Sequence, residues 1–244
     1  MRLSTASAAL VALSAAACAS APSTHDAPAA APIVIYDGRV ANGPTAPVSA
    51  RDGALDRTVL TAVDPAFLTD REQCGDAGGR VLSVAGTASG AFTAAGRDQR
   101  LYLVTEVPCD AESLADEANA WSHLVVVEGG AVVANVKAWG TAIARVADID
   151  GDGVAEIATT AGGTGQGFTV ENLQIASVAG GRAAVVRPVD EVYTDGCGTL
   201  EDKRDVEVVL LTVIPASPPR FTTTRFRASC DGMSGPADFE PVAE

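Results

Sequence analysis

The apolar residues of this chain fall into short runs, most of them rich in Val, Ile and Thr, and the runs end at Gly, Pro, Asp or Asn. Such runs are typical of β-strands, because β-branched side chains fit a pleated sheet and turn residues separate one strand from the next. We therefore predict an all-β fold of antiparallel strands and hairpins, built as a propeller-blade-like unit or a sandwich. The expected strands are Ile33–Tyr36, Thr58–Val63, Arg80–Val84, Arg100–Val107, His123–Val127, Ala131–Val136, Glu156–Thr160, Asn172–Val178, Ala183–Arg187, Asp205–Ile214 and Phe221–Ala228.

Two segments predict hairpins most clearly. Residues 123–136, HLVVVEGGAVVANV, carry two β-rich runs on either side of a turn at Glu128-Gly129-Gly130. Residues 172–186, NLQIASVAGGRAAVV, repeat the arrangement around Ala179-Gly180-Gly181. Glycine supplies the positive φ that tight turns require.

Helix is expected in few places. Residues 64–73, DPAFLTDREQ, predict two helical turns with Asp64 as the N-cap and Pro65 at the first helical position. Residues 110–120, DAESLADEANA, lack a clear apolar stripe. They are predicted to form a solvated acidic loop, with a short helix as the alternative.

The N-terminus has the features of an export signal. Arg2 gives it a positive start, and residues 3–17 are uncharged and mostly Ala, Leu and Val. This stretch is too short to span a bilayer but has the length of a signal-peptide core. Residues 19–31 are rich in Ala and Pro, the composition of a tether. We predict a signal peptide over residues 1–18, a tether over residues 19–31 and a single all-β domain over residues 32–244.

Two forms of processing are compatible with these residues. AAAC resembles a bacterial lipobox, which would make Cys18 the acylated first residue of a lipoprotein. Cleavage after Ala19 or Ala21 would instead release a soluble product. We expect a lipid anchor in the cell envelope, either in the periplasm or at the outer surface, and otherwise a secreted or periplasmic protein.

The chain has five cysteines, and removing Cys18 leaves an even set for an oxidising compartment. In two places a cysteine followed by Gly and a later cysteine followed by Asp bracket a pair of strand-like runs. This similarity predicts the disulfides Cys74–Cys109 and Cys197–Cys230, one of three possible pairings. Each would close a loop of about 35 residues, worth on the order of 4 kcal/mol in the chain-entropy model.

One acidic loop stands out, VADIDGDGVAEIATT at residues 146–160. Four carboxylates fall within nine residues, and Gly153 lies where a sharp turn is needed. Without a cation, carboxylates about 5 Å apart repel by roughly 3 kcal/mol per pair at an effective dielectric constant of 20. Calcium prefers such a set of hard oxygen ligands. The candidate ligands are the side chains of Asp148, Asp150, Asp152 and Glu156 and the carbonyl of Val154.

These residues resemble the calcium loop of FG-GAP (VCBS-type) repeats, which follow the pattern D-x-[DN]-x-D-G-x-x-[DE]-[IL]. The resemblance covers residues 146–160 in a single copy. It implies a loop followed by a blade strand, a bound Ca²⁺ and an adhesive or ligand-presenting role. An EF-hand does not fit, because Thr159 lies where a bidentate glutamate is required. The matching residues are Asp148, Asp150, Asp152, Gly153, Glu156 and Ile157.

The net charge of the chain limits the classes of partner that we expect it to bind. The formal net charge is −14, and Lys137 and Lys203 are the only lysines. Nucleic acids and anionic membrane surfaces both require basic patches, so we expect neither as a partner. Membrane attachment is expected only through an N-terminal lipid, because no second apolar run of about 18 residues exists.

The sequence offers no obvious catalytic set. His123 is the only histidine after the tether, and no GxSxG motif is present. We therefore predict a non-enzymatic, exported calcium-binding protein that binds an envelope protein or glycan. Two alternatives remain open: an envelope polysaccharide hydrolase that uses a carboxylate pair, and a structural or inhibitor-like secreted domain.

Overall fold

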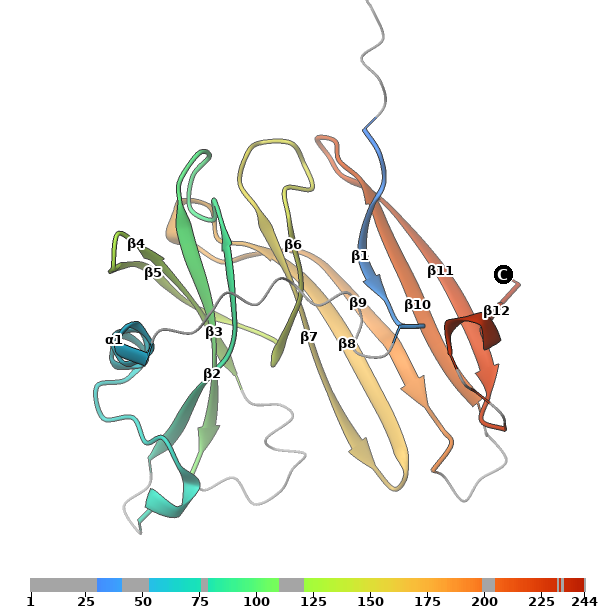
Figure 1. Ribbon diagram of the computed structural model, residues 1–244, viewed down its shortest axis with the longest axis horizontal. Helices are drawn as coiled ribbons and strands as arrows, with labels where there is room; N and C mark the ends of the chain where they lie inside the picture. Colours follow the sequence, from blue (N-terminus) through green and yellow to red (C-terminus); the bar gives the residue numbers. More distant parts are fainter. Residues whose placement is uncertain are drawn as a thin grey trace, which may run out of the picture.

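The computed structural model describes residues 30–40, 53–75, 79–109, 121–198, 205–231, 233 and 235–243. Their strands form two antiparallel sheets, so the all-β prediction is confirmed (Figure 1). The larger sheet has eight strands and the smaller has four. Seven strands of the larger sheet are, in spatial order, β12 (Glu240–Pro241), β11 (Arg220–Ser229), β10 (Asp205–Ile214), β9 (Ala184–Asp195), β8 (Phe168–Ser177), β7 (Glu156–Gly165) and β6 (Ala142–Ala147).

The larger sheet is curled into a half-barrel. Its eighth strand, β1 (Ile33–Asp37), pairs with β10 from Leu210 to Val213. Strand β9 pairs with the other end of β10, from Val206 to Val208. One edge of β10 is therefore shared between the first strand of the domain and a strand some 150 residues later in the chain.

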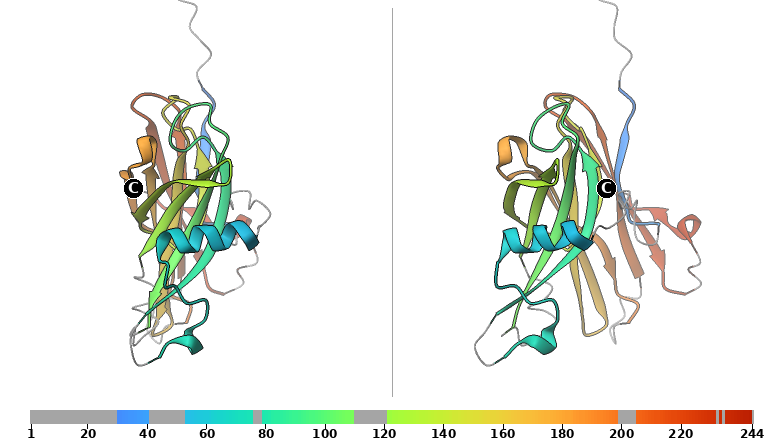
Figure 2. Two further views of the ribbon diagram at one scale, coloured as in Figure 1. Left: turned by 90° about the vertical axis from the view of Figure 1, so that its left-hand side faces the viewer. Right: turned by 60° about the vertical axis from the view of Figure 1, so that its left-hand side comes forward.

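The smaller sheet lies between the half-barrel and the helix α1 (Gly53–Val63), as Figure 2 shows. Leu101 and Leu124 on one of its faces pack with Ile157 of β7, whereas Tyr102 and Val125 on the other face pack with the helix. Both faces are thus covered, which explains why β4 is buried at nearly every position. The strands are β2 (Arg80–Gly90), β3 (Gln99–Pro108), β4 (Ser122–Glu128) and β5 (Ala131–Ala138), in that order.

A separate core fills the inner face of the half-barrel. Ile35 of β1, Leu173 of β8 and Leu211 of β10 belong to it, together with Ile149 from the loop after β6. Each of these side chains is at most 2% exposed. The acidic loop is therefore anchored in the core by the isoleucine between its first two aspartates.

Both expected hairpins form. Gly129 and Gly130 have φ angles of 58° and 85° and connect β4 to β5. The turn between β8 and β9 is the short 3₁₀-helix η2 (Ala179–Gly181), in which Gly180 and Gly181 also have positive φ. The other 3₁₀-helices of the described residues are η1 (Arg71–Gln73) and η3 (Pro236–Asp238).

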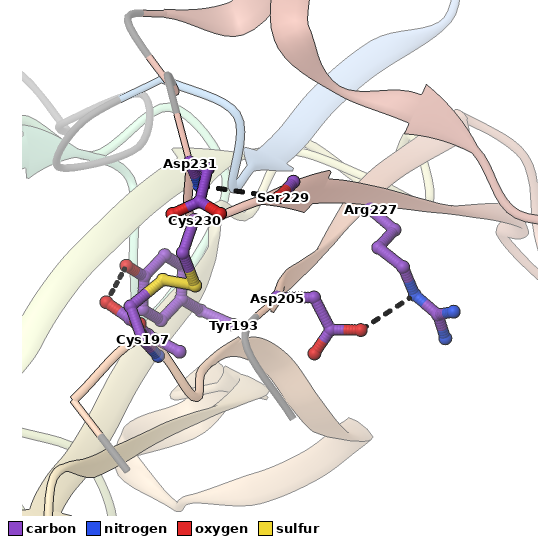
Figure 3. Close-up of a disulfide and its surroundings, with 8 residues drawn as sticks. Tyr193, Cys197, Asp205, Arg227, Ser229, Cys230 and Asp231 are labelled. Atoms are coloured by element: carbon purple, nitrogen blue, oxygen red, sulfur yellow. Dashed lines mark hydrogen bonds and ion pairs between the residues drawn. A yellow bond between two sulfur atoms is a disulfide. The ribbon is translucent and has the colours of Figure 1, made fainter. Parts of the chain in front are cut away.

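The predicted disulfides are confirmed. Cys74 and Cys109 bracket the hairpin β2–β3, and Cys197 and Cys230 bracket the hairpin β10–β11. Figure 3 shows the second disulfide next to Tyr193, at the end of β9. The repeated Cys-Gly and Cys-Asp pattern therefore marks one hairpin in each sheet.

Two predictions in the N-terminal third are wrong. The run predicted as a strand, Thr58–Val63, lies in α1, where Leu55, Val59, Leu60 and Val63 form one apolar face against the smaller sheet. The helix predicted over residues 64–73 contains only η1, and Asp64 instead accepts a hydrogen bond from the N–H of Ala66 in a turn. Tertiary packing on the helix outweighs the β-propensity of its Thr and Val residues.

The remaining differences concern one strand that was not predicted and the residues outside the described ranges. Strand β6 was not expected, since AIARVA lacks the Val and Ile pattern of the other strands. The acidic segment 110–120 and residues 1–29, with the expected signal and Cys18, lie outside the described residues. No helix in the described ranges is both long and apolar enough to cross a membrane.

Candidate metal centre

The acidic loop connects β6 to β7 and lies at one end of the half-barrel (Figure 1). Gly151 and Gly153 have φ angles of 82° and 84°, which non-glycine residues rarely adopt. The N–H of Ala155 donates to the carbonyl of Ala91, in the β2–β3 connection, at 2.7 Å. The loop therefore joins the larger sheet to the smaller one at this end of the molecule.

Asp148 organises the first half of the loop. Its two carboxylate oxygens accept hydrogen bonds from the N–H groups of Gly151 at 2.7 Å and Gly153 at 2.9 Å. Asp150 accepts from the N–H of Asp152 at 3.2 Å. These local bonds fold the backbone tightly and bring alternate carboxylates to the same side of the loop.

Glu156 is the first residue of β7, and only 4% of its surface is exposed. Its Oε2 accepts one hydrogen bond, from the N–H of Ile149 at 3.1 Å. Burial raises the pKa of this carboxyl to about 7, and the charges of Asp150, Asp152 and Asp148 add to the rise, against the lowering effect of the Ile149 N–H. The protein thus holds a buried carboxyl among negative charges.

One carboxylate oxygen from each of Asp148, Asp150 and Glu156 lies within 4.8 Å of the other two. Ca²⁺ binds oxygen ligands at about 2.3–2.6 Å, so ligand oxygens around one ion lie at most about 5 Å apart. Three carboxylates at this spacing fit a hard divalent cation. Its charge would offset both the burial of Glu156 and the repulsion among the three groups.

The other two predicted ligands are placed differently. Asp152 is exposed and is not part of the three-carboxylate group; its Oδ1 accepts from the N–H of Val154 at 2.7 Å. Val154 is buried, with 6% of its surface exposed. The structure therefore groups three of the four predicted carboxylate ligands.

A second buried acidic site was not expected from the sequence. Glu106 on β3 is 6% exposed, and its Oε1 lies 2.8 Å from Nη1 of Arg80 on β2. Its Oε2 lies 3.2 Å from Nε2 of His123 on β4. These three residues are neighbours only because β2, β3 and β4 pair side by side, so their separation in the chain gave no signal.

His123 extends this network to the helix. Its Nδ1 lies 2.8 Å from Oδ1 of Asn135, and Asn135 Nδ2 donates to the carbonyl of Ala62 at 2.8 Å. Both ring nitrogens of His123 thus face side-chain oxygens. With both ring nitrogens occupied in this way, the network ties α1 to the smaller sheet and fits a structural role better than a catalytic one.

Comparison with known proteins gives no match to this chain. The chain matches no protein-family model, no curated protein and no solved structure. Function has to be inferred from the sites themselves.

Proposed function

We propose that this protein is an exported, non-enzymatic β domain that binds Ca²⁺ at the Asp148–Glu156 loop and another component of the cell envelope elsewhere on its surface. The observation that carries the calcium proposal is the position of Glu156. Its carboxyl is buried, and the charged groups that act on its pKa are three aspartates. A buried negative charge requires a nearby positive one, and a bound divalent cation supplies it.

The residues present suit Ca²⁺ better than a softer metal. The three grouped ligands are carboxylates, without cysteine or histidine, and hard oxygens favour calcium, magnesium or manganese. Asp148, Asp150 and Glu156 would hold the ion. When bound, it would supply positive charge and cross-link the ends of the loop, and no chemical step at this site is required of it.

A bound ion would affect the rigidity of the domain. The loop contacts the β2–β3 connection through Ala155 and the β10–β11 connection through the N–H of Ala216, which donates to Ile149. An ion that stiffens the loop therefore stiffens the junction of the two sheets. This bracing role agrees with the FG-GAP-like residues of the loop, whose resemblance also favours a binding role for the domain.

Export is proposed on two grounds. The first 18 residues have the composition of a signal peptide that ends at a lipobox-like Cys18. The four remaining cysteines form two disulfides, which persist in oxidising compartments. A lipid on Cys18 would place the domain at an envelope membrane, where an envelope protein or glycan is its expected partner.

Isothermal titration of the purified protein with Ca²⁺ tests the calcium proposal. Extracellular calcium modules often have dissociation constants of about 10⁻⁴ to 10⁻³ M, and we expect one site in this range. Asp150→Asn should abolish the binding heat. Asp190→Asn, an exposed aspartate on β9, is the matched control and should leave it unchanged. Absence of binding by the native protein, or unchanged binding by Asp150→Asn, would contradict the proposal.

A capture experiment addresses the partner. The protein, immobilised through its C-terminus, is incubated with an envelope extract in the presence of Ca²⁺ or EDTA. We expect a specific envelope protein or glycan to be retained more strongly with Ca²⁺. Equal retention in both buffers would separate partner binding from the calcium loop.

A further inference from the structure

The half-barrel has an open groove at the end away from the acidic loop. Its volume is about 690 Å³, within the range of small-molecule sites. Ala142 of β6 and Thr160 of β7 line its edge, and they pair across the hairpin at the end opposite Asp148. The mouth of a curled sheet is a common place for a ligand site.

The sequence produces this groove by changing the residues along the inner face. Near the acidic loop, Ala158 and Leu173 fill that face as part of the core. Further along, Gly162, Glu171 and Tyr193 lie in one row across β7, β8 and β9. Gly162 lets the backbones of β7 and β8 approach closely beside the glutamate, because a Cβ there would lie 2.3 Å from the carbonyl oxygen of Val170.

Glu171 is held in position by a tyrosine. Tyr36 of β1 is 5% exposed, and its hydroxyl donates to Oε2 of Glu171 at 2.8 Å. Burial raises the pKa of Tyr36, and the neighbouring Glu171 raises it further, so the phenol stays neutral and remains a hydrogen-bond donor. Tyr193, shown in Figure 3, lines the same groove from β9.

Positive charge is missing from the groove lining. Glu171 is the one ionised group among the lining residues of the described chain, and none of them is Lys, Arg or His. The nearby Arg39 is engaged elsewhere, because its guanidinium pairs with Asp37 at 2.8 Å and stacks over the ring of Phe226. Among the described lining residues, a ligand that enters this groove therefore meets a carboxylate and no cationic side chain.

We propose that the groove binds a small organic cation, whose ammonium group contacts Glu171 between Tyr36 and Tyr193. A carboxylate attracts an ammonium group strongly in a partly desolvated site, and aromatic rings add cation–π attraction. The threonines and Ala142 along the edge accept the uncharged body of such a ligand. This site is separate from the calcium loop and does not depend on it.

Two-dimensional NMR of the ¹⁵N-labelled protein tests the proposal with choline and n-butylammonium as probes. Dimethylbutanol, the uncharged carbon isostere of choline, is the matched control ligand. We expect millimolar choline to shift the amide signals of Gly162, Gly163 and Glu171, and the isostere to leave them in place. Glu171→Gln should weaken choline binding about tenfold or more, while Glu240→Gln, an exposed glutamate on β12, should not change it.

Three results would overturn the proposal: no shift with either cation, equal shifts with the uncharged isostere, or unchanged choline affinity in Glu171→Gln. The first two use the native protein, so they do not depend on how the variant folds. The titrations are run with Ca²⁺ and with EDTA. Choline binding in both buffers supports the groove whether or not the loop binds calcium.

Discussion

Two glutamates are buried in the described part of the chain, and their surroundings are opposite. Glu106 in the smaller sheet has Arg80 on one carboxylate oxygen and His123 on the other. Glu156 in the larger sheet has one backbone N–H and three neighbouring aspartates. Their exposed fractions, 6% and 4%, are nearly the same, so burial alone does not explain the difference.

The comparison shows how this protein balances a buried carboxylate with its own side chains at one of the two sites. At Glu106 the chain supplies two nitrogen groups from neighbouring strands, the Arg80 guanidinium and the His123 ring. At Glu156 it supplies more negative charge, an arrangement that is unfavourable unless a cation enters from solution. We therefore infer that Glu106 belongs to a closed, structural network and that Glu156 belongs to a site built for a metal ion.

The largest change in unfolding free energy is expected in the network of Arg80, Glu106 and His123. Glu106→Gln leaves the buried His123 without its negative partner, and removing one member of a buried pair costs about 3 kcal/mol or more. Urea unfolding at pH 7 should show this loss equally with EDTA and with Ca²⁺. Glu240→Gln controls for the change in net charge. A loss that calcium alters would break the contrast between the two glutamates.

The second largest effect is expected in the pH dependence of the unfolding free energy, and it comes from Glu156. Its folded-state pKa is raised from 4.5 to about 7, so the folded protein binds the proton more tightly than the unfolded chain. In EDTA this contribution to stability is therefore present below pH 4.5 and is lost as the pH rises through 7. At about 1.4 kcal/mol per pKa unit the loss between pH 4.5 and pH 8 is roughly 3 kcal/mol.

The measurement is the unfolding free energy in EDTA between pH 4.5 and pH 8 for the native protein and for Glu156→Gln. The difference between the two isolates Glu156 from groups that titrate in the opposite sense, such as Asp37, whose pKa is lowered by Arg39. A difference that does not change with pH would show that Glu156 is not held in the environment described.

Calcium itself should have a smaller effect. At a Ca²⁺ concentration ten times the dissociation constant, one site adds about 1.4 kcal/mol to the unfolding free energy. Thermal unfolding with Ca²⁺ and with EDTA measures it, and Mg²⁺ at the same concentration serves as the control ion. No shift with calcium at pH 8 would contradict metal binding by the folded loop.

The smallest effect is expected at Arg80. Half of its side chain is exposed, and His123 still faces Glu106 when Arg80 is replaced. Arg80→Met should therefore destabilise the protein by about 1 kcal/mol in urea unfolding, less than Glu106→Gln. An equal loss in both variants would mean that the arginine, and not the histidine, balances the buried charge.

The two glutamates also show what sequence patterns can predict. The aspartates of the loop are two residues apart, so their local arrangement could be predicted, as could the glycine turns and the cysteine-bracketed hairpins. The Glu106 network joins residues 17 to 43 positions apart on neighbouring strands, so it depends on strand pairing that no local pattern contains. Likewise, that Glu156 is buried while Asp152 is exposed depends on how the loop packs against the β2–β3 connection.

The same dependence on contacts between distant residues explains the errors in the fold prediction. Helix α1 was misread because Thr58, Val59 and Thr61 have strand propensity, although its apolar residues follow helical spacing. Strand β6 is held in place by pairing with β7 and not by its own composition. Strand β1 pairs with β10, a contact between distant parts of the chain that no local pattern predicts.

The central claim is that a cation completes the site around Glu156, and the stability of Glu156→Gln relative to the native protein tests it most directly. At pH 8 in EDTA we expect the variant to be the more stable of the two, because it lacks an uncompensated buried charge. With Ca²⁺ at ten times the dissociation constant we expect the native protein to gain about 1.4 kcal/mol and the variant to gain nothing, so that the difference between them narrows by about half. An equal difference in both buffers would contradict the account.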